Sequence, residues 1–188
     1  GFYVCYQAVR SSTNEIVAIR RSTNSLPEEV ERFNKEVSIQ APMDHPAVLP
    51  ILGYSRPTDE NSFCYVVLPL MPNGDLRNLI GRAAKGANPC HDWSTARSII
   101  IIGIAAGMAY IHQRSVVHLD INPSNVLLDE DFHPKIGDFA LALHAGDKLP
   151  GMVGTPLYIP PEEFENDDGE ALSCSREQDI YSFSITLY

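Results

Sequence analysis

The chain has 188 residues, a length that suits one domain of ordinary size. Hydrophobic residues make up 44% of it, so a sizeable core can be buried and wholesale disorder is excluded. With 24 acidic against 14 basic residues, the formal net charge of -10 argues against non-specific binding to nucleic acid or to an anionic membrane surface.

The chain up to about Leu70 is strand-like, with one helix. Strands are expected at Tyr3–Ala8, Glu15–Arg20, Val48–Leu52 and Phe63–Leu70. A helix is expected over Pro27–Gln40, because proline and acidic residues fill its first turn and apolar residues recur along one face.

After residues 71–74 (MPNG) the pattern becomes helical. Helices are expected at Asp75–Arg82, at Ser94–Gln113 and from about Arg176, and short apolar pieces lie at Val116–His118 and Val126–Leu128. Residues 138–162 contain 4 Pro and 3 Gly with little periodicity, which is typical of a long functional loop. The acidic run Glu162–Glu170 is expected to be a solvated loop.

The longest apolar run, residues 99–110, is shorter than the roughly 20 residues that span a bilayer. We therefore expect a fully buried core helix there, and no membrane insertion of this segment. The four cysteines (Cys5, Cys64, Cys90 and Cys174) lack metal-ligand spacing, which predicts reduced thiols and a cytoplasmic location.

Several polar motifs follow one another in a fixed order. They are V-A-I-R at residues 17–20, Glu36, H-L-D-I-N-P-S-N at 118–125, D-F-A at 138–140, G-T-P-L-Y at 154–158 and P-P-E at 160–162. In order and spacing the set resembles the eukaryotic protein kinase family. Residues 71–76 and 107–112 look like its tyrosine-kinase-like group, which mostly phosphorylates Ser and Thr, and Pro123 is also similar to Ser/Thr kinases.

The resemblance implies an α+β, bilobal protein-kinase-like fold. Residues 1–70 would form a small β-rich N-lobe with one helix, and residues 71–188 a larger, mainly helical C-lobe. We expect this domain to be incomplete at both ends, because a strand pattern already runs at Tyr3 and a helical pattern reaches Tyr188. The implied reaction is transfer of the γ-phosphoryl of ATP, with Mg²⁺, to Ser/Thr hydroxyls of a protein substrate or signalling partner.

The resemblance also implies roles for single residues. Asp120 would orient the substrate hydroxyl and accept its proton, and Asn122 occupies the catalytic-loop position of a lysine. Asn125 and Asp138 match the two metal ligands, and hard oxygen atoms suit Mg²⁺. The ATP-binding residues would be Arg20 and Glu36 at the phosphates, Cys5 and Ala18 above the adenine, Leu127 below it, Leu68 behind it, and the backbone of Pro69 and Met71 at the hinge.

Five residues depart from the family pattern. Arg20 replaces a lysine, and its wide planar fork should misplace one partner in a slot built for an ammonium. Tyr3 stands where the third loop glycine is expected, and Asn122 carries no charge to neutralise the phosphoryl group. Ala140 replaces the glycine of D-F-G, which disfavours positive φ. Leu119 replaces an arginine that pairs with a phosphorylated activation loop in the family.

Residues 138–162 contain only two hydroxyl side chains, Thr155 and Tyr158, and both lie in a motif similar to the substrate-docking turn. We therefore expect that activation-loop phosphorylation does not switch this chain on. Asp179, His118 and His45 resemble structural residues of the family.

Two functions remain open from the sequence. One is a protein kinase whose transfer activity is weak. The alternative is a pseudokinase that acts as a nucleotide-binding or scaffolding module, and an incomplete fragment is a third possibility.

Overall fold

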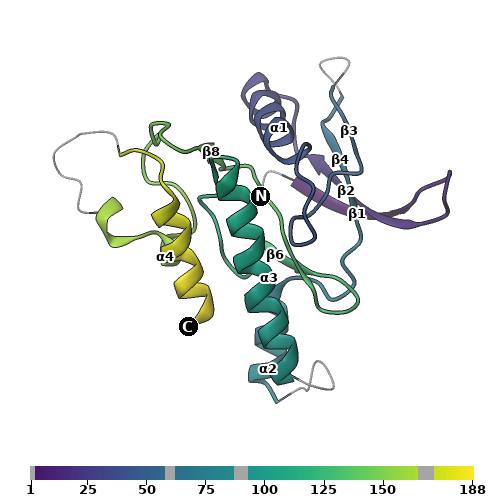
Figure 1. Ribbon diagram of the computed structural model, residues 1–188. Helices are drawn as coiled ribbons and strands as arrows, with labels where there is room; N and C mark the ends of the chain where they lie inside the picture. Colours follow the sequence, from purple (N-terminus) through teal and green to yellow (C-terminus); the bar gives the residue numbers. More distant parts are fainter. Residues whose placement is uncertain (1–2, 58–61, 87–92, 165–171) are drawn as a thin grey trace.

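The computed structural model describes residues 3–57, 62–86, 93–164 and 172–188, and Figure 1 shows how they are arranged. A four-stranded antiparallel sheet is formed by residues from the first part of the chain, in the order β1-β2-β4-β3. Its strands are β1 (Tyr3–Val9), β2 (Ile16–Ser22), β3 (Gly53–Ser55) and β4 (Tyr65–Pro69).

Helix α1 (Pro27–Gln40) lies beside this sheet and has the bounds that the sequence predicts. Proline stands in its first turn, where a missing N–H costs nothing, and Glu28 and Glu29 complement the positive end of the helix. Phe33 and Val37, one turn apart, are buried in a cluster with residues of β4. That packing fixes the rotation of α1 and turns Glu36 inward.

The second part of the chain is mainly helical. Its helices are α2 (Leu76–Ala84), α3 (Trp93–Gln113) and α4 (Arg176–Leu187), and its 3₁₀ turns are η1 (Pro156–Tyr158) and η2 (Pro161–Glu163). The strands β6 (Val126–Leu128) and β7 (Pro134–Ile136) form a hairpin, and β5 (Val116–Val117) pairs with β8 (Leu143–His144), which follows that hairpin in the chain. The combination of a β-rich first part with a helical second part confirms the predicted α+β, protein-kinase-like fold. The division at residues 70 and 71 stays a prediction.

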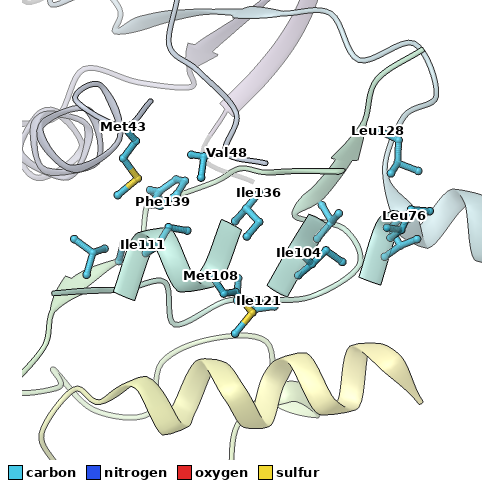
Figure 2. Close-up of a cluster of buried hydrophobic side chains, with 14 of the residues drawn as sticks. Met43, Val48, Leu76, Ile104, Met108, Ile111, Ile121, Leu128, Ile136 and Phe139 are labelled. Atoms are coloured by element: carbon cyan, nitrogen blue, oxygen red, sulfur yellow. The ribbon is translucent and has the colours of Figure 1, made fainter. Parts of the chain in front are cut away.

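The largest hydrophobic core in the described part of the chain lies between α3, strand β5 and the hairpin β6–β7 (Figure 2). Ile104, Met108 and Ile111 of α3 are buried there against Ile136 of β7. Gly107 makes this approach possible, because a Cβ atom at that position would lie 2.9 Å from Cδ1 of Ile136 and 3.0 Å from the carbonyl oxygen of Ala47. The contact places the end of β7, and with it Asp138, relative to the helical part.

Only one face of α3 is buried, so the expectation of a fully buried helix is wrong. Residues 94–113 are long and apolar enough to cross a membrane by length and composition, and only 33% of their most apolar stretch is buried. Ile102, on the other face, is 68% exposed. The absence of membrane insertion stays a prediction.

The shortest elements differ most from expectation. Val48–Leu52 forms no strand, because Val48 makes only an isolated bridge to Ile136, through the backbone hydrogen bonds of Ala47 and Leu49 with Ile136, and no ladder continues from it. The strands β3, β7 and β8 were not predicted. Most of the acidic run Glu162–Glu170 and Cys90 lie outside the described residues, whereas Cys5, Cys64 and Cys174 are unpaired thiols.

Candidate active site

Arg20 connects the sheet to helix α1 and to the hairpin β6–β7. From β2, its Nη2 donates to Oε1 of Glu36, which is fully buried, and its Nη1 lies 3.5 Å from Oδ1 of Asp138. Burial by itself would lower the pKa of Arg20, but the two carboxylates outweigh it and the pKa is raised. Arg20 is therefore a fixed cation between the first and second parts of the chain.

Asp120 is held by hydrogen bonds on both carboxylate oxygens. Its Oδ1 accepts from the backbone N–H of Thr155 at 2.9 Å and from the Thr155 hydroxyl at 2.7 Å. Its Oδ2 accepts from Nδ2 of Asn125 at 2.6 Å. Three donors therefore fix the rotamer of this carboxylate.

Asn125 stands next to Asp138 because of the hairpin β6–β7. The carbonyl oxygen of Asn125 accepts from the N–H of Gly137 at 2.9 Å, so the residues just outside the paired strands stay together. Asp138 follows directly. The structure thus brings Asp120, Asn125 and Asp138 to one place, through side-chain and backbone hydrogen bonds.

Asp138 and Phe139 point in opposite directions. Phe139 is fully buried, with its ring edge-on to His118 at 4.8 Å between centroids, and Figure 2 shows it between Met43 and Ile111. Asp138 has a positive φ of 62° and its side chain is 46% exposed. The buried phenylalanine therefore anchors a chain segment that presents the Asp138 carboxylate outward, beside Arg20.

Asp179 of α4 anchors the loop before Asp120, as its structural assignment predicts. Its two carboxylate oxygens accept the N–H groups of His118 and Leu119, each at 2.8 Å. Nε2 of His112 also lies 2.8 Å from the carboxylate. These contacts are buried, so they hold the loop rigidly.

Asn122 is 4% exposed and is bonded within its own loop. Its Nδ2 donates to the carbonyl oxygen of Asp120 at 3.1 Å and to the hydroxyl of Thr155 at 3.2 Å, and its Oδ1 accepts from the N–H of Ser124 at 2.9 Å. In this structure the side chain of Asn122 holds Asp120 and Thr155 in place through these hydrogen bonds. A catalytic role for Asn122 stays a prediction.

Most of the expected adenine-site residues gather in one place. Ala18, Met71 and Leu127 pack against the cluster that contains Leu68. Across the strands, Ala18 faces Leu68 and Val17 faces Pro69. Cys5, opposite Arg20 in the register of β1 and β2, is exposed.

The comparisons with known proteins identify the family of this chain. The family model for the protein kinase domain matches residues 1–188. The chain belongs to the protein kinase domain family. Its relatives include the dual specificity protein kinase shkB of Dictyostelium discoideum, 34% identical over 92% of this chain, and the L-type lectin-domain containing receptor kinase IV.3 of Arabidopsis thaliana, 32% identical over the whole chain.

A third relative, the nodulation receptor kinase of Pisum sativum, is 32% identical over the whole chain. This chain spans only 20–27% of the length of these three proteins. Two of the three are named as receptor kinases and one as a dual specificity protein kinase.

Protein kinases use ATP and Mg²⁺, and the residues of this kinase domain fit the metal. Asn125 offers an amide oxygen and Asp138 an exposed carboxylate, both hard oxygen ligands. No group of three His, Cys, Asp or Glu side chains in the described part of the chain could hold a metal by itself. Mg²⁺ is commonly bound by one or two protein ligands together with substrate phosphates, which is what this pair of residues could provide.

Two of the departures are accommodated locally. Ala140 is not among the residues with positive φ, so the missing glycine causes no backbone strain. Leu119 has a positive φ of 65° but is buried, in a cluster with Val117, Leu149 and Cys174. An apolar cluster thus surrounds the position at which the family has an arginine.

Sequence reasoning misses the contacts that three residues make in the site. The resemblance places Thr155 in a substrate-docking turn, yet Thr155 binds Asp120 directly. His112 and Tyr3 also contact site residues, Asp179 and Glu36. The motif around Thr155 was recognised, but no spacing rule says that a threonine reaches back to a carboxylate in an earlier loop.

Proposed function

We propose that this kinase domain transfers the γ-phosphoryl of ATP to Ser/Thr hydroxyls of a protein, at a low rate. Two sets of contacts carry the proposal, one from Glu36 through Arg20 to Asp138 and one from Asn125 to Asp120. The backbone hydrogen bond from Gly137 to Asn125 connects them. Phosphoryl transfer depends mainly on positioning and on electrostatic stabilisation, and these contacts supply positioning before any substrate arrives.

Asp120 is suited to orient a substrate hydroxyl. A carboxylate has about four acceptor positions, and three of them are used by Thr155 and Asn125. The remaining position, on Oδ2, would accept the hydroxyl proton while the hydroxyl oxygen bonds to the γ-phosphorus and the bond from that phosphorus to the bridging oxygen breaks, releasing ADP. Because the other positions are filled, the carboxylate does not need to reorient during the reaction.

Asn125 and Asp138 would hold the Mg²⁺ of bound nucleotide, and Arg20 would contact the phosphates. The metal, when bound, neutralises phosphate charge. Arg20 already has two carboxylate partners, Glu36 and Asp138, so it reaches the nucleotide only through the remaining donors of its fork. Together with the neutral Asn122, this supports a rate below that of a kinase with two lysines.

The protein partner and the location are proposals as well. A net charge of -10 favours basic substrate segments, through long-range attraction. The unpaired thiols Cys5, Cys64 and Cys174 support a reducing, cytoplasmic setting for this domain.

The test uses the full chain, with and without MgATP. Thermal unfolding should shift upward, because a ligand at 100 times its dissociation constant adds about 2.7 kcal/mol of stability. Labelled phosphate should be incorporated into a basic protein, and Asp120→Asn should abolish incorporation while keeping the thermal shift. A thermal shift without incorporation in the wild-type protein would assign the domain to nucleotide binding or scaffolding, and no shift would overturn ATP binding itself.

A further inference from the structure

Tyr3, at the start of β1, contacts both members of the Arg20–Glu36 ion pair. Its ring lies 4.2 Å from Cζ of Arg20, measured to the ring centroid, and its hydroxyl donates to Oε2 of Glu36 at 2.8 Å. The oxygens of Glu36 are therefore divided between two donors, Oε1 for Arg20 and Oε2 for Tyr3. The three side chains form one compact unit.

Arg20 needs support of this kind because of its shape. A guanidinium is planar and carries its donors in a fixed fork, so small rotations of the plane move both Nη atoms. Nε of Arg20 is buried without a hydrogen-bond partner in the described part of the chain, so that end of the group is not fixed by a hydrogen bond. An aromatic face attracts a guanidinium lying over it and restricts the tilt of its plane.

The hydroxyl of Tyr3 can serve only as a donor to Glu36. Burial, reinforced by the neighbouring Glu36 carboxylate, raises the pKa of Tyr3, so the phenol stays protonated. Its hydrogen bond holds the Glu36 carboxylate, and the ring holds the Arg20 plane against that carboxylate. Both contacts act on the direction in which the second Nη atom points, which is toward Asp138.

We propose that Tyr3 is a positioning residue for Arg20, and that the tyrosine and the arginine are matched to each other at this site. The tyrosine fixes the guanidinium plane so that one Nη serves Glu36 while the other faces Asp138 and the phosphates of bound nucleotide. This inference rests on the proposed function, because it assigns Arg20 to nucleotide phosphates.

The test compares MgATP with adenosine, which has no phosphates. Dissociation constants are measured on the full chain with Tyr3→Leu, which removes the ring, and with Tyr3→Phe, which removes only the hydroxyl. Tyr3→Leu should weaken MgATP binding about 3- to 10-fold, the size expected of one cation–π contact, and leave adenosine binding unchanged. Tyr3→Phe should restore more than half of that loss on a logarithmic scale.

A changed background and a control variant make the comparison specific. In an Arg20→Lys background, Tyr3→Leu should change MgATP affinity less than about twofold, because a compact ammonium has no plane to support. Tyr6→Leu is the matched control, since Tyr6 lies on the same strand over a different arginine, Arg21, with 5.6 Å between its ring centroid and Cζ. It should leave MgATP affinity unchanged.

Three results of the binding measurements would overturn the proposal. The first is that Tyr3→Leu weakens adenosine binding as much as MgATP binding. The second is that Tyr3→Leu weakens MgATP binding as much in the Arg20→Lys background as in the wild type. The third is that Tyr3→Leu tightens MgATP binding, which would show that Tyr3 obstructs the nucleotide. Unfolding free energies of the nucleotide-free proteins separate this inference from the proposed function. Non-additive effects of Tyr3→Leu and Arg20→Lys support the pairing even if MgATP does not bind, whereas additive effects overturn it even if MgATP binds.

Discussion

Thr155 donates both its backbone N–H and its hydroxyl to the same carboxylate oxygen of Asp120, 35 residues earlier in the chain. The contact joins the end of the loop that begins at Asp138 to the residue proposed to accept the substrate proton. The position of that loop and the orientation of the carboxylate are therefore not independent.

Removing the hydroxyl should slow transfer. Thr155→Ala takes away one hydrogen bond to a charged group, worth about 1.5–3 kcal/mol, so kcat should fall about 10- to 100-fold. The affinity for MgATP should not change, because Thr155 contacts Asp120 rather than the metal ligands. Thr155→Ser keeps the hydroxyl and is the control, and equal rates for the alanine and serine variants would contradict the role of the hydroxyl.

The loop end also approaches the backbone closely at Gly154. A Cβ atom there would lie 2.6 Å from the carbonyl oxygen of Leu119, and φ is +114°. Gly154→Ala should therefore move Thr155 away from Asp120 and lower kcat at least about tenfold. Gly151→Ala is the matched control, because Gly151 also has positive φ (+131°) but open space around it. Similar losses in both variants would show that backbone strain alone is responsible.

Asp179 should be a large contributor to stability. Asp179→Ala leaves the N–H groups of His118 and Leu119 buried without their acceptor, and each such group costs about 1–3 kcal/mol. Chemical denaturation should show a loss of about 3 kcal/mol or more in the free energy of unfolding. Asp131→Ala, at an exposed acid, should change it by less than about 0.5 kcal/mol. Comparable values for the two variants would contradict the anchoring role.

Leu119 should not be replaceable by the arginine of the family pattern. Leu119→Arg would place a charge in the cluster of Val117, Leu149 and Cys174, which should lower the unfolding free energy by about 2 kcal/mol or more.

Phosphatase treatment of the wild-type protein should leave its transfer rate unchanged. A phosphorylated residue within 138–162 that raises the transfer rate would contradict the prediction that phosphorylation of this loop does not activate the domain.

Helix α1 could be predicted with its bounds because its signals are local: proline in the first turn, acids after it, and a regular apolar face. The strands β7 and β8 are three and two residues long, too short to show any periodicity. Val48–Leu52 reads as a strand because it is apolar, yet Val48 is buried between other elements without a ladder of its own. Burial and strand formation give the same pattern over so few residues.

The candidate site, like the fold, could be predicted only in part. Asp120, Asn125 and Asp138 could be assigned from the order of motifs in the sequence. The contacts of Thr155 with Asp120 and of His112 with Asp179 could not, because they join residues 35 and 67 positions apart through tertiary packing. For Tyr3 the sequence predicts only a disturbed glycine-rich loop, since no local pattern shows that its ring lies against the guanidinium of Arg20.

Whether Asn125 and Asp138 hold the metal of bound nucleotide is tested most directly by the magnesium dependence of ATP affinity. Dissociation constants for ATP are measured with and without Mg²⁺ for the wild-type chain, for Asp138→Asn and for the exposed-site control Asp131→Asn. Magnesium should tighten ATP binding to the wild type and to Asp131→Asn, and Asp138→Asn should lose about tenfold or more of that gain. An undiminished magnesium effect in Asp138→Asn would contradict the placement of the metal at this residue.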